Sequence, residues 1–234
     1  MNLTKLSIND QLGLAGMILT NTQEETPLME ALASRSYDQT KIDVGAAHYE
    51  TAQGIVADLS AEEGEVKALS VELKAGQKET HDEYMDLLKM ARIICKNDPK
   101  TADKLRLNEP RIRSSFYDWA KQAQDFFTGV LKDNNMVEAF AYRGFLLEDL
   151  QRVQAKVDNL VDIRNRKQLA YGRVQTLRVE RDKMMDVLLQ RLEDFLYVLA
   201  YAVKDNPQQL EKVGIQVYTE AYMARQRALA KKAN

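Results

Sequence analysis

The sequence of 234 residues matches itself at an offset of 108 positions. Residues 4–107 align with residues 112–215 without a gap, and twenty of the aligned pairs are identical. The matches include Gly64 with Gly172, which a shared helical period does not require. Because self-similarity at a fixed offset is the signature of a repeated structural unit, we predict a tandem duplication.

The offset divides the chain into three predicted parts. We expect helical repeat 1 at residues 1–108, helical repeat 2 at residues 109–216 and a basic C-terminal helix at residues 217–234. A short apolar run at Leu12–Leu19 has a counterpart in the second repeat, so we assign it to the fold rather than to a signal peptide.

The sequence pattern predicts an all-α fold. Ten glycines and four prolines are too few for the many hairpins of an all-β chain. Ser7 and Ser115 each precede an acid by three residues, which is typical of a helix start. We therefore expect long antiparallel helices in a helical bundle with coiled-coil-like packing, and no strands.

Each repeat is expected to hold four helices. In repeat 1 we favour a turn near residues 57–60, which would fold the long segment into an antiparallel hairpin; repeat 2 would turn near Arg164–Gln168. One continuous helix is the alternative, because that second turn lacks glycine and proline. The expected helices of repeat 1 cover about residues 7–22, 27–57, 60–96 and 99–107.

The net charge of −2 conceals an acidic half and a basic half. Residues 1–108 carry 12 basic and 18 acidic side chains, whereas residues 109–234 carry 21 basic and 17 acidic ones. Opposite charges suit surfaces that meet, within the chain or head to tail between chains. We therefore expect a protein partner or a homo-oligomer.

An anionic surface is the alternative partner for the basic half. Acids are interspersed among the basic residues and the net positive charge is small, so nucleic acid is the weaker expectation, as is a membrane surface. The basic side chains in question are Arg164, Arg166, Lys167, Arg173, Arg178 and Arg181.

No catalytic set is recognised, and we predict no catalytic residue, no metal site and no cofactor. His48 and His81 are the only histidines, and neither is repeated or preceded at three residues by glutamate. The glycines are scattered, so no phosphate-binding loop is predicted. Cys95 aligns with Val203, which indicates a packed thiol. A cofactor-binding site or small-molecule ligand stays unknown.

Repeated side chains are the remaining candidates for a site. Arg35 and Arg143 are expected to pair with an acid on a neighbouring helix, with ligand recognition as the alternative. Trp119 is expected to pack where the two repeats meet. Repeated carboxylates could bind a ligand or a metal, although caps and surface ion pairs are the favoured interpretation; they are Asp10, Asp118, Glu30, Glu138, Glu72, Glu180, Asp86 and Asp194.

The expected function is that of a non-enzymatic scaffold or interaction protein that presents helical faces and associates through its acidic and basic halves. Charged residues interrupt the apolar stretch Met184–Val203, so no transmembrane segment is predicted. Within it, residues 195–203 are apolar on every face and are expected in a core. A lone cysteine suits a reducing compartment, and we expect a cytoplasmic protein.

Overall fold

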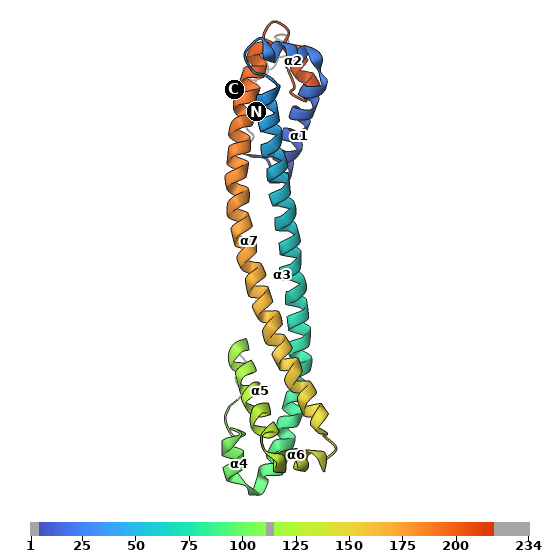
Figure 1. Cartoon of the computed structure of the whole chain (residues 1–234), viewed down its shortest axis with the longest axis vertical. Coiled ribbons are helices and arrows are strands. Elements are labelled where there is room, and N and C mark those ends of the chain that lie inside the picture. Colours follow the sequence, from blue (N-terminus) through green and yellow to red (C-terminus); the bar gives the residue numbers. More distant parts are fainter. Residues whose placement is uncertain (1–4, 111–114, 218–234) are drawn as a thin grey trace, which may run out of the picture. The chain divides into compact units, whose positions relative to one another are not determined.

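The computed structural model describes residues 5–110 and 115–217, and within these ranges every regular element is a helix. The predicted all-α class is confirmed (Figure 1). The predicted basic helix at residues 217–234 lies almost wholly outside the described residues. The elements are α1 (Ile8–Glu24), α2 (Thr26–Ala33), α3 (Gln39–Ile94), η2 (Cys95–Asn97), α4 (Pro99–Lys104), α5 (Phe116–Leu131), α6 (Asn134–Ala141), α7 (Leu147–Ala202) and η3 (Pro207–Val213).

Side-chain caps fix the starts of several helices. The Ser7 hydroxyl accepts a hydrogen bond from the Asp10 backbone N–H at 3.2 Å, and Ser115 accepts one from Asp118 at 3.4 Å. These bonds satisfy amide groups that the first helical turn leaves without partners. The capping role predicted for the two serines is therefore confirmed.

The predicted hairpin is wrong, because α3 and α7 are each one continuous helix of 56 residues. Ser60 and Glu63 resemble a capping box, yet α3 continues through them and through Gly64 without a turn. Buried side chains recur on both sides of this point, at Leu59 and Leu69, so an unbroken apolar face favours an unbroken helix. The turn predicted near Arg164–Gln168 is likewise absent.

The predicted helix at 27–57 is also wrong in its first part. Helix α2 ends at Ala33, and Ser36 adopts a left-handed φ of 59° before α3 begins at Gln39. A left-handed residue cannot continue a right-handed helix, so the chain changes direction here. Gly144, at φ 87°, performs the same turn between α6 and α7.

Helix boundaries recur at the 108-residue offset. Helices α6 and α7 begin and end 108 residues after α2 and α3, respectively. The left-handed residues follow the same spacing, because Ser36 corresponds to Gly144 and Arg106 corresponds to Gly214.

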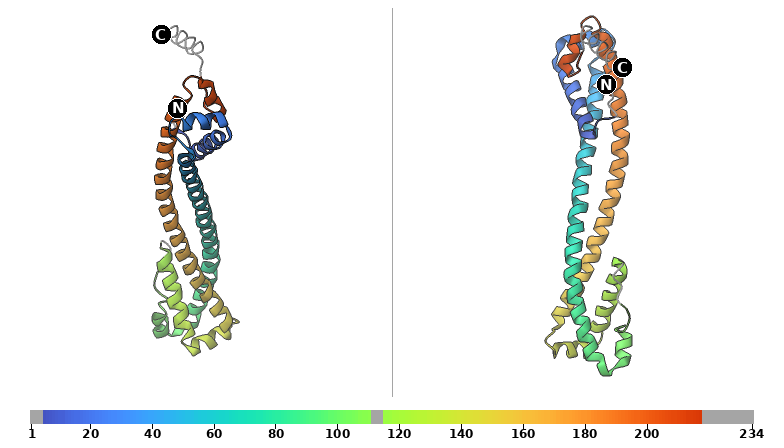
Figure 2. Two further views of the ribbon diagram at one scale, coloured as in Figure 1. Left: turned by 45° about the horizontal axis from the view of Figure 1, so that its top comes forward. Right: turned by 180° about the vertical axis from the view of Figure 1, so that it is seen from behind.

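The described chain forms two compact units. Unit 1 combines residues 5–60 with 175–217, and unit 2 combines residues 61–110 with 115–174. Each unit therefore draws helices from both predicted repeats, and within each a part of α3 packs against a part of α7 (Figures 1 and 2). The sequence offset and the compact units divide the chain at different places.

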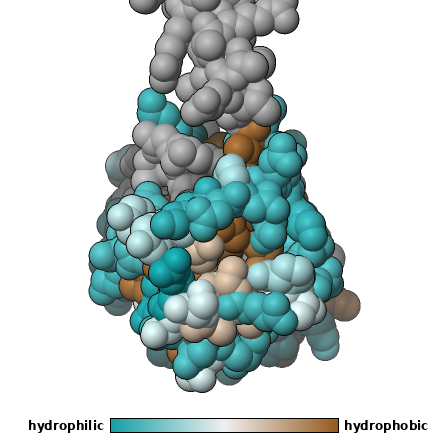
Figure 3. Space-filling model, turned by 90° about the horizontal axis from the view of Figure 1, so that it is seen from above, coloured by the Kyte–Doolittle hydropathy of each residue, from teal (hydrophilic) through white to brown (hydrophobic). Residues whose placement is uncertain are grey.

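Unit 1 encloses most of the apolar stretch near the end of α7. Leu188, Phe195 and Leu199 lie in its core together with Leu28 and Leu32 of α2. The prediction that residues 195–203 lie in a core is therefore confirmed for one face of the helix, which is buried. On the other face, Tyr197 and Tyr201 are exposed. An end-on view of this unit shows a mostly hydrophilic surface with a few hydrophobic residues between (Figure 3).

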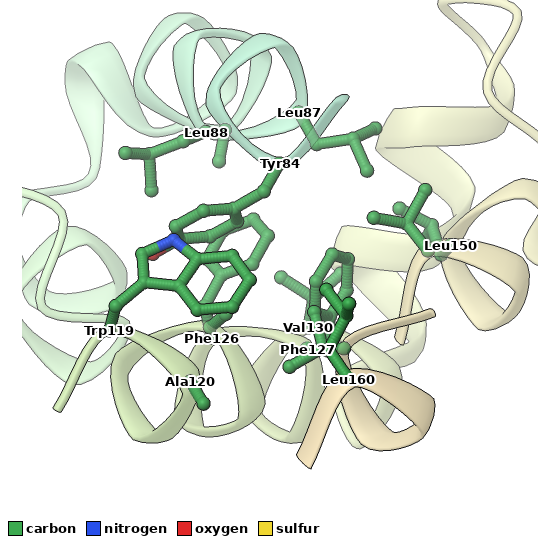
Figure 4. Packing of buried hydrophobic residues seen from close by; sticks show 14 of the residues in the cluster. Tyr84, Leu87, Leu88, Trp119, Ala120, Phe126, Phe127, Val130, Leu150 and Leu160 are labelled. Atoms are coloured by element: carbon green, nitrogen blue, oxygen red, sulfur yellow. The ribbon is translucent and has the colours of Figure 1, made fainter. Parts of the chain in front are cut away.

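Unit 2 has an aromatic core between α3 and α5 (Figure 4). The Tyr84 ring centroid lies 5.5 Å from that of Phe126 and 6.0 Å from that of Phe127. Trp119 is 3% exposed and packs from α5 toward α3, so it lies where the two predicted repeats meet. Cys95 is buried near Met136, in agreement with the predicted packed thiol.

Among the described helices, none is both long and apolar enough to cross a membrane.

Candidate functional site

Cross-helix ion pairs join α3 to α7 within unit 2. Lys156 Nζ lies 2.5 Å from Glu79 Oε1 and 2.6 Å from Glu83 Oε1. Arg152 Nη1 lies 2.9 Å from Glu83 Oε2. The acidic side chains belong to the acidic half and the basic ones to the basic half, so opposite charges of the two halves meet inside one chain.

These contacts shift the titration of the groups involved. Burial alone would raise the pKa of Glu83, but the hydrogen bonds and charges of Lys156 and Arg152 outweigh it and lower the pKa. Hydrogen bonds to Glu79 and Glu83 raise the pKa of Lys156. The ionised forms therefore stabilise each other.

A second set of ion pairs involves equivalent positions of the two halves. Arg173 Nη2 lies 3.1 Å from Glu65 Oε2, and Arg173 Nε lies 2.8 Å from Glu62 Oε1. Glu65 and Arg173 are 108 residues apart, so they occupy the same position in the sequence alignment. Two identical side chains would carry like charges here, whereas the divergent residues attract each other.

A pocket of about 320 Å³ opens on unit 2. Helix α3 contributes Lys74, Gln77, Lys78 and His81, whose spacing of three, four and seven residues places them on one helical face. Helix α5 contributes Trp119 from its first turn, just after the Ser115 cap. We call this site the lysine pocket.

One hydrogen bond fixes the wall of the lysine pocket. Trp119 Nε1–H donates to His81 Nδ1 at 3.0 Å. Because Nδ1 is an acceptor here, a neutral His81 carries its proton on Nε2. His81 therefore has the structural contact expected of a packed histidine and keeps one ring N–H as a further donor.

Sequence reasoning missed the lysine pocket, although a signal was present. The five lining residues among those that the structure describes all differ from their counterparts at the 108-residue offset. Lys74 and Lys78 replace acids, which reverses the charge of this helical face. Finding the site also required knowing that α5 packs on this face of α3. The counterparts are Asp182, Met185, Asp186, Leu189 and Gln11.

The repeated carboxylates do not gather into a site among the described residues. All eight are exposed, and no cluster of three metal-ligating side chains occurs in this part of the chain. Asp10 accepts a hydrogen bond from the Ser7 hydroxyl at 2.6 Å, and Asp86 lies 2.8 Å from Lys89 Nζ. Asp10 therefore takes part in a helix cap, and Asp86 takes part in a local ion pair.

Arg35 and Arg143 contact other partners than the predicted acids. The Arg35 guanidinium lies 4.9 Å from the centroid of the Tyr201 ring. Arg143 donates to the Ala139 carbonyl at 2.8 Å. Aromatic and backbone contacts thus take the place of the acid predicted for each guanidinium.

The basic side chains proposed for an anionic surface are partly engaged within the chain. Arg173 bonds to glutamates of α3, and Arg181 Nη2 lies 2.7 Å from Asp182 Oδ1. The Arg164 Nε atom is buried without a hydrogen-bond partner among the described residues. Ion pairs within the chain therefore engage Arg173 and Arg181.

The turn between α6 and α7 exposes large apolar side chains. Tyr142 is 88% exposed, Leu146 is 56% exposed and Leu147 is 40% exposed. We call these three residues the apolar turn. Their counterparts in the first half are all polar, namely Ser34, Asp38 and Gln39.

Comparison with known proteins gives no match to a protein-family model, to a curated protein or to a solved structure.

Proposed function

We propose that this protein is a non-enzymatic helical scaffold that binds a partner protein through the apolar turn of unit 2. The exposure of Tyr142, Leu146 and Leu147 carries the proposal. Tyrosine and arginine are enriched among residues that dominate binding energy at interfaces, and Arg143 lies over the Tyr142 ring with its Cζ 6.0 Å from the centroid.

The contrast between the two halves supports this assignment. A turn with the same length and the same left-handed residue position occurs in unit 1, and polar residues occupy its three equivalent positions, Ser34, Asp38 and Gln39. The fold of the turn therefore does not require exposed apolar side chains. Clustered apolar exposure beyond what folding requires is typical of a binding surface.

We also propose that the chain arose by tandem duplication and that its long helices pair as a coiled coil. The recurrence of helix boundaries and left-handed residues at one offset supports the duplication. Buried residues separated by multiples of seven support the coiled coil. In α7 they are Val153, Leu160, Val174, Leu188 and Phe195. The buried lone thiol agrees with a cytoplasmic location.

The test replaces the apolar turn with the residues of the first half. The triple variant Tyr142→Ser, Leu146→Asp, Leu147→Gln keeps Gly144 and should fold. A photo-crosslinking side chain at position 142 should give a discrete adduct with a partner protein or a second copy. With the crosslinker at the neighbouring position 143, the otherwise unchanged chain should give the same adduct and the triple variant should lose it.

A matched control changes another exposed apolar residue of the same unit. Val71→Ser removes a side chain that is 68% exposed on α3 and should leave the adduct intact. Light scattering over a concentration series separates a second copy from a different protein. The proposal fails if position 142 gives no discrete adduct, or if the triple variant retains it.

A further inference from the structure

We infer that the lysine pocket binds a small organic anion, in which a carboxylate or phosphate group is attached to a flat apolar body. This inference uses residues other than the apolar turn and is independent of the proposed scaffold function. It rests on the donors that converge on the pocket, on its aromatic wall and on the charge reversal between the two halves.

The polar lining of the pocket is rich in hydrogen-bond donors. Lys74 and Lys78 supply ammonium groups that donate only, and Gln77 supplies an amide that can also accept. The Trp119 contact leaves the His81 Nε2–H as a further donor. No carboxylate lines the pocket among the described residues. This donor set suits an oxyanion and disfavours a cation.

The two lysines have no carboxylate partner in the described part of the chain. They are four residues apart on α3, so their ammonium groups repel each other. The adjacent acid Glu79 is already bonded to Lys156 on α7. A bound oxyanion would neutralise this local excess of positive charge through charge-assisted hydrogen bonds.

The aromatic wall selects a flat apolar body next to the anionic group. Trp119 is held by its bond to His81 and by contact with Phe116, whose ring centroid lies 5.7 Å away. Trp119 is 3% exposed, so a small part of its rigid indole lines the pocket, and the apolar part of a ligand can pack against it. A volume of about 320 Å³ lies at the small end of ligand pockets and fits a single substituted ring.

The equivalent positions in unit 1 indicate that binding belongs to unit 2 alone. Asp182 and Asp186 stand where Lys74 and Lys78 stand, and Gln11 replaces Trp119. A feature required by the helical fold would persist at both places. The lysines and the tryptophan therefore reflect a property that only one unit has acquired.

The only tryptophan of the chain lies in the pocket, so its fluorescence reports on the site directly. We would titrate the full chain with phenyl phosphate, benzoate, inorganic phosphate and benzyl alcohol, and repeat each titration by calorimetry. Saturable binding is expected for phenyl phosphate or benzoate. The difference between these two identifies the preferred oxyanion, while inorganic phosphate and benzyl alcohol should bind at least about tenfold more weakly.

The decisive variant is Lys74→Gln with Lys78→Gln, which removes both charges from an exposed helical face. Binding should weaken about tenfold or more. Lys100→Gln with Lys132→Gln makes the same change of net charge elsewhere in unit 2 and should bind as the wild type does. Absence of saturable binding by both methods, or equal affinity of the pocket variant and the wild type, would overturn the inference.

Discussion

Two glycines of α1 should respond in opposite directions to the same substitution. Gly13 is exposed, and a Cβ atom added to it would meet nothing within 4 Å. Gly16 is buried, and its added Cβ would lie 2.5 Å from Tyr49 Oη and 2.8 Å from Tyr49 Cζ on α3. Both changes add one methyl group to the same helix. A difference between their effects on the free energy of unfolding therefore reports on the close contact between α1 and α3 at Gly16.

The expected magnitudes follow from these distances. Gly13→Ala should raise the free energy of unfolding by about 0.5–1 kcal/mol, the usual gain of alanine over glycine within a helix. Gly16→Ala has the same local gain, but it must displace a rigid ring at a typical overpacking cost of about 1–3 kcal/mol. We expect a net loss of about 1–2 kcal/mol.

Thermal and urea unfolding, followed by circular dichroism, would measure both variants. At this chain length, 1 kcal/mol corresponds to about 2–4 °C in the midpoint, so the midpoints of the two variants should differ by roughly 3–12 °C. Tyr49→Leu should rescue Gly16→Ala but not improve Gly13→Ala, because it removes the obstructing ring. If both alanine variants were equally stabilised, the close approach of Gly16 to Tyr49 would be refuted.

Three further predictions concern unit 2. Lys156→Gln should lower stability by about 1 kcal/mol at neutral pH. Because the pKa of Glu83 is lowered by folding, the stabilisation is present above its ordinary value near 4.5 and is lost as pH falls through the lowered value, so acid titration of unfolding should be flatter in the variant. Phe127→Ala removes a fully buried ring and should cost about 3–5 kcal/mol in a urea melt; a cost below 1 kcal/mol would contradict the packing. Glu65→Arg should lower the thermal midpoint through repulsion from Arg173, and adding Arg173→Glu should restore it; no recovery would exclude the pairing.

Local chemistry made part of the fold predictable from the sequence. The caps at Ser7 and Ser115 depend on residues three positions away, and the all-α class depends on composition and period. Continuity of α3 was harder to predict, because Ser60 and Glu63 resemble a helix start. Whether a cap-like pattern ends a helix depends on what packs against the helix, and that partner, α7, lies about 100 residues further along the chain.

The candidate site was less predictable than the fold. Lys74 and Lys78 line a pocket only because Trp119 of α5 packs beside them on α3. The spacing of residues in the sequence does not predict which helix packs against this face. The charge split of the two halves did point to surfaces that meet, and Lys156 with Glu83 is one such contact. The contact partners of Arg35 and Arg143 could not be predicted from the sequence, because an aromatic ring and a carboxylate are both favourable partners of a guanidinium.

The assembly of unit 1 from distant segments sets an order for folding during synthesis. Asn21 Nδ2 donates to the Lys212 carbonyl, and Lys212 Nζ bonds to Glu25, so these contacts close loops of almost 200 residues. Helices α1 and α2 leave the ribosome long before the part of α7 that covers them. Unit 2 is continuous in sequence and can pack first. The apolar faces of residues 5–60 are synthesised first and remain without their α7 partner for the longest time. This segment is therefore the one most exposed to aggregation while the chain is being made.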